Sequence, residues 1–215
     1  MQHVITNIIF DVDGTLVDSK RDIAAAQHWV LGQLGVHSYQ PEELYPLIGK
    51  PLTETFARLL PPSLHHRIVE ASELYKARYP PHALETTTLF PGVKETIAAL
   101  HLRGINLATA TTKLSAGTRR VLTHFGIADQ FTQIQGSDDM PFKPNPFIIT
   151  KILTDQGWKK DDTLIVGDTD NDIEAGKRAG IRTCGVTYGS LSKEQIGKLK
   201  PDLMIDSLPE LLDIL

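Results

Sequence analysis

The chain has almost no cysteine: Cys184 is the only one in 215 residues, so no internal disulfide can form. Nothing in the sequence therefore calls for an oxidising compartment. An excess of positive charge is also missing, because 22 Lys and Arg stand against 26 Asp and Glu, for a net charge of -4. This balance provides no general attraction to nucleic acid or to an anionic membrane.

Long apolar runs are absent as well. No stretch approaches the ~18 consecutive apolar residues that a membrane span needs. The apolar start lacks a basic leader and runs directly into Asp11 and Asp13, which the apolar region of a secretory signal would not tolerate. We therefore expect a cytoplasmic protein with no membrane partner. Cys184 lies in a probable strand, 182–186, where a small buried hydrophobic residue is expected rather than a reactive thiol.

What the sequence does contain is ordinary for a globular protein, with 41% hydrophobic and 22% charged residues. Strand and helix patterns alternate through most of it, which predicts an α/β fold with a doubly wound parallel sheet. The predicted strands are 4–10, 105–110, 131–135, 163–166, 183–187 and 202–205. The predicted helices of the α/β part are 91–102, 115–125, 146–156, 170–179 and 209–214, with a small helix before 202.

A second region has a different pattern. A helix is expected from Asp18 or Ser19 to about Leu34, and helical segments alone follow to about Leu84. Prolines separate these segments, and no strand candidate appears among them. We therefore predict an all-helical domain, 19–83, inserted into an α/β core formed by 1–18 and 84–215.

The first candidate site follows the first predicted strand. Asp11 and Asp13 come where this strand ends, and Gly14 allows a sharp turn beyond them. Open α/β folds bind ligands at the carboxyl ends of their strands. Two carboxylates this close repel each other unless a cation or a shared proton neutralises them, and a hard divalent ion suits oxygen ligands. The alternative is an Asp-Gly turn with no function.

Two further polar segments follow later strands. Thr111 and Thr112 precede a helix, where hydroxyls and free N–H groups suit an oxyanion, although threonines are common at strand ends. Lys143 lies in a loop stiffened by three prolines, which is typical of a cation held in one place; the alternative is a solvated loop lysine.

The segment 163–172 repeats the first pattern, an apolar strand followed by carboxylates. Asp168 and Asp172 lie four residues apart and share a helix face if a helix begins near Asp168. Acidic residues at a helix start also cap it and its dipole, and we assign that capping role to Asp170.

In order and spacing, these segments resemble the four motifs of the haloacid dehalogenase-like phosphohydrolase superfamily, over essentially the whole chain. Residues 11–15 are similar to the first motif, Thr111 to the second, Lys143 to the third and 167–172 to the fourth. The helical insertion between the first two motifs resembles the family's helical cap. The most similar branch is the phosphoglycolate phosphatase-like one, which also contains pyrophosphatases. Thr112 departs from it, because that branch commonly has Asn there.

The resemblance implies a phosphatase that uses an aspartyl-phosphate intermediate. Asp11 is then the nucleophile, and Asp13 protonates the leaving group and later deprotonates water. Thr111 and Lys143 stabilise the transferring phosphoryl group, with Thr112 as a further substrate contact. The implied cofactor is Mg²⁺, and the residues implied to hold it are Asp11, Asp13, Asp168 and Asp172.

Several alternatives stay open at this stage. A dehalogenase does not need Asp13, because halide leaves without a proton. A sugar-phosphate mutase, a pyrophosphatase, a nucleotidase and a binding module without catalysis are the other candidates. The expected partner is a small phosphorylated metabolite, and the chain is a monomer or a homodimer. Lys50, in a Gly/Pro-bounded turn of the insertion, is a candidate contact for a carboxylate-bearing substrate such as phosphoglycolate, or else a solvated lysine.

Overall fold

The computed structural model describes residues 4–215, which form two compact units. One unit comprises 4–17 and Leu89–Leu215, and the other is Asp18–Thr88. The predicted insertion, 19–83, lies within the second unit, and residues 1–3 of the predicted core lie outside the described residues. No helix among the described residues is both long and apolar enough to span a membrane.

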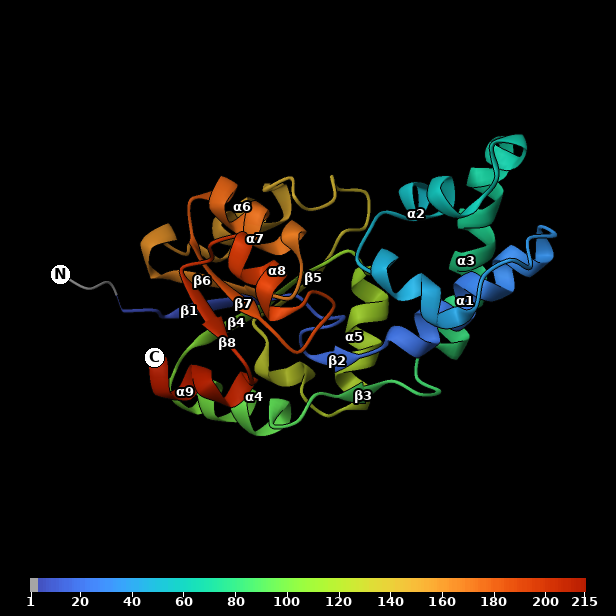
Figure 1. Cartoon of the computed structure of the whole chain (residues 1–215). Coiled ribbons are helices and arrows are strands. Elements are labelled where there is room, and N and C mark those ends of the chain that lie inside the picture. The colour runs from blue at the N-terminus through green and yellow to red at the C-terminus, as the bar shows by residue number, and fades with distance from the viewer. Residues whose placement is uncertain (1–3) are drawn as a thin grey trace. The chain divides into compact units, whose positions relative to one another are not determined.

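The first unit is built on a parallel six-stranded sheet (Figure 1). Its strands, in sheet order, are β5 (Gln133–Gly136), β4 (Asn106–Thr111), β1 (Asn7–Phe10), β6 (Thr163–Gly167), β7 (Arg182–Val186) and β8 (Leu203–Ile205). β4 lies on one side of β1 and β6 on the other. Strands are therefore added outward from β1 first in one direction and then in the other, and β1 lies at the topological switch point of the sheet. In open α/β sheets, ligands bind beyond the carboxyl ends of the strands at such a switch.

Helices cover both faces of this sheet. Figure 1 shows α6 and α7 on one face and α4 and α9 on the other. The helices of this unit are α4 (Val93–Leu102), α5 (Ser115–His124), α6 (Phe147–Gln156), α7 (Asp170–Ala179), α8 (Lys193–Lys198) and α9 (Leu211–Ile214), with short 3₁₀ turns η3 (Ala128–Gln130), η4 (Lys160–Asp162) and η5 (Leu208–Glu210). All four residues of β1 are buried, as expected for a strand covered on both faces.

The core between the sheet and its first helical layer consists of aliphatic side chains. Ile9 of β1 and Ile165 of β6 pack in one cluster with Ile149 and Ile152 of α6, and all four are completely buried. Each buried side chain of this size contributes roughly 1.5–3 kcal/mol through burial of apolar surface. This packing fixes β1 and β6 side by side, and therefore the positions of the loops that follow them.

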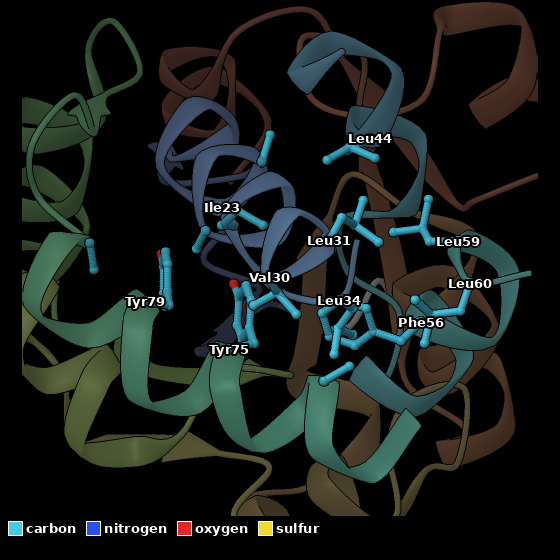
Figure 2. Close-up of a cluster of buried hydrophobic side chains, with 14 residues drawn as sticks. Ile23, Val30, Leu31, Leu34, Leu44, Phe56, Leu59, Leu60, Tyr75 and Tyr79 are labelled. Atoms are coloured by element: carbon cyan, nitrogen blue, oxygen red, sulfur yellow. The ribbon is translucent and has the colours of Figure 1, made fainter. Parts of the chain in front are cut away.

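The second unit has its own helical core (Figure 2). Its helices are α1 (Lys20–Gln33), α2 (Leu52–Leu59) and α3 (Ile68–His82), with 3₁₀ turns η1 (Pro41–Leu47) and η2 (Pro62–Arg67). Phe56 meets Tyr75 edge-on, with ring centroids 6.4 Å apart, and Tyr75 stacks on Tyr79 at 5.3 Å. Val30 and Leu31 of α1 are completely buried in the same cluster. The aromatic and aliphatic contacts hold the three helices together.

The start of α1 is tied to the end of the unit by one buried carboxylate. Asp22 accepts hydrogen bonds from the backbone N–H groups of Thr86 and Thr87, at 3.0 Å each, and from both hydroxyls at 2.6 Å. These four donors satisfy the carboxylate oxygens, and their hydrogen bonds offset the free-energy cost of burying the charge. β2 (Val17–Asp18) and β3 (Thr88–Leu89) pair in a separate two-stranded sheet.

Three local predictions were wrong. The strands β2 and β3 were not foreseen, because two residues carry no periodicity. α4 begins at Val93 and not at Pro91, since Gly92 adopts a left-handed φ of 75° that a right-handed helix excludes. α3 continues through Pro80 and Pro81 to His82 instead of ending before them, so these prolines occupy its last turn.

Candidate active site

Three strand ends bring the predicted motifs together. Asp11 directly follows β1, and its N–H donates to the carbonyl of Val166 in β6 at 2.9 Å. In the sheet register, Phe10 is level with Thr109 of β4 and with Val166. Thr111 ends β4 and Asp168 follows β6, so both lie at the same edge of the sheet as Asp11. The predicted convergence of these segments follows directly from the parallel register.

Three carboxylates form a buried cluster at this edge. Asp11, Asp168 and Asp172 each offer an oxygen, and these oxygens all lie within 4.8 Å of one another. Asp168 and Asp172 are completely buried, and Asp11 is 7% exposed. Burial, and then the neighbouring Asp172, raises the pKa of Asp168 to about 6. Burial raises the pKa of Asp11 well above its ordinary value. A divalent cation would relieve both effects, and an all-oxygen donor set fits a hard ion.

The orientation of Asp168 is fixed by its neighbours. The Thr15 hydroxyl donates to Oδ1 at 3.2 Å, and the Ser190 N–H donates to Oδ2 at 2.7 Å. Gly14, with φ of 87°, brings the first motif against this carboxylate, because an added Cβ there would lie 2.1 Å from Oδ2. Gly189 also packs against this residue, because an added Cβ there would lie 2.3 Å from the Asp168 Cβ. Both glycines are therefore required for the close approach of the backbone to Asp168.

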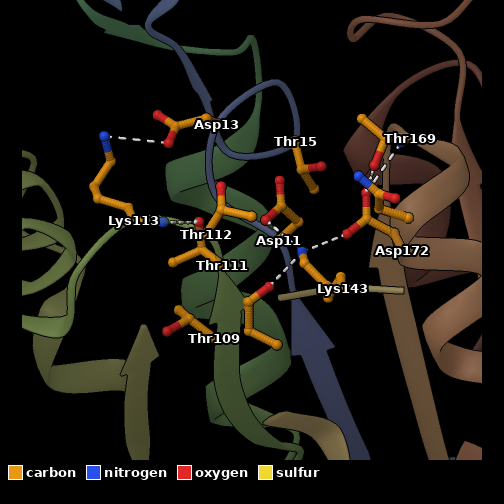
Figure 3. A network of polar contacts seen from close by, with 12 residues as sticks. Asp11, Asp13, Thr15, Thr109, Thr111, Thr112, Lys113, Lys143, Thr169 and Asp172 are labelled. Carbon is orange, nitrogen blue, oxygen red and sulfur yellow. Dashed lines mark hydrogen bonds and ion pairs between the residues drawn. The ribbon is translucent and has the colours of Figure 1, made fainter. Parts of the chain in front are cut away.

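Lys143 lies between two members of the cluster (Figure 3). Its Nζ donates to Asp11 Oδ1 at 2.8 Å, to the carbonyl of Ala110 at 2.7 Å, and to Asp172 Oδ1. Burial opposes its positive charge, but the carboxylates of Asp11 and Asp172 outweigh burial and raise the pKa of Lys143. Lys143 is therefore a fixed cation beside the Asp11 carboxylate.

Asp172 has a second role. Its Oδ2 accepts hydrogen bonds from the Thr169 N–H at 3.0 Å and the Thr169 hydroxyl at 2.6 Å, which forms a capping box at the start of α7. Asp172, and not Asp170, therefore makes the capping hydrogen bonds. Asp170 accepts from the adjacent Asn171 N–H at 3.1 Å and lies in the first turn of α7, where its charge suits the helix dipole as predicted. The third residue of the helix can reach back to the N-cap residue, whereas the first cannot.

The second motif forms a turn beside Asp13. The Lys113 N–H donates to the Thr111 hydroxyl at 3.4 Å, and the Thr112 carbonyl accepts from the Ser137 hydroxyl at 2.7 Å. The Lys113 Nζ lies 3.1 Å from Asp13 Oδ2. Thr111 is buried.

Lys50 is the one predicted substrate contact that belongs to the helical unit. There its Nζ lies 3.7 Å from Glu54 in a weak ion pair. The structure therefore brings the Asp11, Lys143, Asp168 and Asp172 side chains into one cluster. The Asp13 carboxylate, also predicted as a metal residue, is not part of that cluster and pairs with Lys113, and Lys50 belongs to the other unit.

The sequence did not predict the roles of Lys113, Gly189 and Ser190. Gly189 and Ser190 follow β7, at the same edge of the sheet as the motifs. Their position after a parallel strand could have indicated a place near the site. Neither residue carries a charged side chain or belongs to a motif that would have identified it.

Comparisons with known proteins agree with this geometry. Residues 8–186 match the family model described as haloacid dehalogenase-like hydrolase. A phosphoglycolate phosphatase of Vibrio vulnificus is 36% identical, covering 99% of this chain and 97% of the relative. The pyrophosphatase PpaX of Halalkalibacterium halodurans is 33% identical, with 98% and 96% covered. A haloacid dehalogenase-like hydrolase structure from Streptococcus pneumoniae superposes with a TM-score of 0.87 at 27% identity, covering 98% of both chains. The chain therefore belongs to the haloacid dehalogenase-like hydrolase family, in its phosphoglycolate phosphatase-like branch.

Proposed function

We propose that this phosphatase is Mg²⁺-dependent and hydrolyses a small phosphomonoester of the phosphoglycolate type through an aspartyl-phosphate intermediate. One observation carries the proposal: the Asp11 carboxylate accepts a hydrogen bond from the buried Lys143 and lies within 4.8 Å of two buried carboxylates able to share a cation with it. Attack by a carboxylate on a phosphate dianion faces charge repulsion. Lys143 and a cation shared by these carboxylates would together place positive charge around the reacting group.

Asp11 and Asp13 both take part in each of the two half-reactions. In the first, an Asp11 oxygen forms a bond to phosphorus while the bond to the leaving oxygen breaks, and Asp13 gives that oxygen its proton. In the second, Asp13 takes a proton from water as the water oxygen attacks phosphorus. The bond to Asp11 then breaks, inorganic phosphate leaves and Asp11 regains its carboxylate.

The remaining residues hold the phosphoryl group. Lys143 fixes the Asp11 carboxylate and neutralises oxygens of the transferring group, and the Thr111 hydroxyl donates to the same oxygens. Thr112 contributes a further contact beside them. Mg²⁺, held by oxygens of Asp11, Asp13 and Asp168 with Asp172 behind them, would neutralise charge on the phosphate.

The helical unit is proposed to act as a substrate-selecting cap. Its sequence lies between the first and second motifs, and its helices have a core of their own. We assign it 19–83 and propose Lys50 as a contact for the substrate carboxylate.

The lone, buried Cys184 supports a cytoplasmic location.

Pyrophosphate is the second candidate substrate, because a relative of similar identity is named as a pyrophosphatase. Both substrates release an anionic leaving group, so the same site chemistry serves either. A mutase and a catalytically inactive module have no comparable support.

The direct test is phosphate release by the purified chain from 2-phosphoglycolate, pyrophosphate and a nucleoside monophosphate. We expect turnover of 2-phosphoglycolate with Mg²⁺ and none in excess chelator, with full recovery when Mg²⁺ is restored. Ca²⁺ should bind but inhibit, because its looser coordination misplaces the reacting groups. Asp11→Asn serves as the background control. Full activity in chelator would contradict the metal dependence, and a wild-type rate equal to that of Asp11→Asn would contradict the proposed function.

A further inference from the structure

A second lysine lies at the reaction centre, on the side away from Lys143. Lys113 forms an ion pair with Asp13, with Nζ 3.1 Å from Oδ2, and the two side chains are only 9% and 11% exposed. Figure 3 shows Asp13 and Lys113 on one side of Asp11, and Lys143 with Asp172 on the other. The two lysines therefore face different parts of any molecule bound at Asp11.

The backbone around Lys113 is held in place by the next loop. The Ser137 N–H donates to the Lys113 carbonyl at 3.1 Å, and the Ser137 hydroxyl donates to the carbonyl of Thr112 at 2.7 Å. The aliphatic part of Lys113 lies along Gly117 of α5, since an added Cβ there would be 3.4 Å from the lysine Cγ. A lysine fixed at both backbone and stem presents its ammonium at a defined point, which lowers the entropy lost when it binds an anion.

The position of that ammonium follows from the role of Asp13. A group that gives its proton to the leaving oxygen must lie within hydrogen-bond distance of it. Lys113 contacts the same carboxylate, so its ammonium borders the space that the leaving group occupies. Lys143 instead contacts Asp11, the residue that accepts the phosphoryl group. Lys143 therefore lies beside the transferred phosphoryl group, and Lys113 lies beside the leaving group.

We propose that Lys113 is a specificity-determining residue that binds an anionic oxygen on the leaving group, two or three bonds beyond the scissile oxygen. A carboxylate, as in 2-phosphoglycolate, and the second phosphate of pyrophosphate both carry such an oxygen. Charge-assisted hydrogen bonds in a shielded site are strong, so substrates with an anionic leaving group are favoured over neutral ones. The inference rests on the proposed function, because it takes Asp13 as the acid–base group.

The test compares substrates that differ mainly in the charge of the leaving group. 2-Phosphoglycolate carries a carboxylate where 2-hydroxyethyl phosphate carries a neutral CH₂OH, and pyrophosphate is the third substrate. The variants are Lys113→Met, which removes the charge, and Lys113→Arg, which keeps it. Lys198→Met is the matched control, because Lys198 is exposed at the surface, where it pairs with Glu194 of the same helix. Thermal unfolding checks that every variant is folded.

In Lys113→Met, kcat/KM for an anionic substrate should fall roughly 10-fold to 100-fold, mainly through KM, the loss expected for one hydrogen bond to a charged group. The value for 2-hydroxyethyl phosphate should change by less than about 3-fold, and Lys113→Arg should keep most of the discrimination. A loss confined to 2-phosphoglycolate or to pyrophosphate identifies the anion as a carboxylate or a phosphate. Lys198→Met should match the wild type on all three.

Equal losses on all three substrates would overturn the inference, because Lys113 would then act only by positioning Asp13. The wild type supplies a test independent of folding: it should prefer 2-phosphoglycolate or pyrophosphate to 2-hydroxyethyl phosphate by at least about 10-fold. A wild type that hydrolyses the neutral ester equally well refutes the role of Lys113 while leaving the proposed function intact. A wild type that hydrolyses none of the three refutes the proposed function.

Discussion

Replacing Gly189 with alanine tests how closely the site depends on packing around Asp168. An added Cβ at this position would lie 2.3 Å from the Asp168 Cβ and 2.4 Å from the Gly14 carbonyl oxygen. Carbon atoms are in optimal contact at about 3.5–4.0 Å, so a movement of about 1 Å is required. Both obstructing atoms belong to the backbone or to the root of a side chain, so rotation about a side-chain bond cannot relieve the contact.

The expected cost has two parts. Overpacking a well-packed region lowers the free energy of unfolding by about 1–3 kcal/mol. Because Asp168 and the first-motif loop must move apart by about 1 Å, the rate of phosphate release should fall about 100-fold. The loss of rate should exceed what the loss of stability explains, since the protein remains folded at the assay temperature.

Gly197→Ala is the matched control. Gly197 lies within α8, and nothing is within 4 Å of an added Cβ there. Alanine is the better helix former by up to about 1 kcal/mol, so this variant should be as stable as the wild type or more so, with unchanged turnover. Urea unfolding and steady-state phosphate release check both variants. A Gly189→Ala protein with wild-type stability and turnover would refute the account of a tightly packed Asp168.

Three further predictions concern single residues. Asp13→Asn should lower turnover of alkyl phosphates by about 10²–10⁴-fold, with a smaller loss for nitrophenyl phosphate, whose leaving group needs no proton; equal losses measured for both substrates would argue against an acid–base role. Lys50→Ala should raise KM for 2-phosphoglycolate and leave nitrophenyl phosphate turnover nearly unchanged; if steady-state kinetics show both substrates responding alike, the selecting groups of the cap lie elsewhere. Cys184 is buried, and burial raises its pKa to about 12, so a thiol reagent at pH 8 should label it only after unfolding; rapid labelling of the native protein would contradict its burial.

The sequence predicted the α/β class and the meeting of the motifs because both depend on local pattern. A run of apolar residues ending in carboxylates identifies a strand and its end, and parallel strands bring their carboxyl ends to one edge. Asp11, Thr111 and Asp168 could therefore be placed near one another without coordinates.

The rest depends on contacts between distant residues that no local pattern encodes. Thr15 donates to Asp168 across 153 positions of sequence, and Ser190 does so from the loop after β7. The pairing of Lys113 with Asp13 was also not predicted, because it joins the loops of two neighbouring strands. The capping role of Asp172 depended on where α7 begins, and element boundaries are the weakest part of a sequence prediction.

The most direct test of the central claim is chemical trapping of the phosphorylated enzyme. The protein is mixed with 2-phosphoglycolate and Mg²⁺, quenched during turnover and treated with borohydride, which reduces an acyl phosphate to an alcohol. Peptide mass spectrometry then locates the reduced residue. The account predicts that Asp11 is converted to homoserine and that an Asp11→Asn protein shows no conversion. Normal turnover in the wild type without any modification at Asp11, or with modification at another carboxylate, would contradict it.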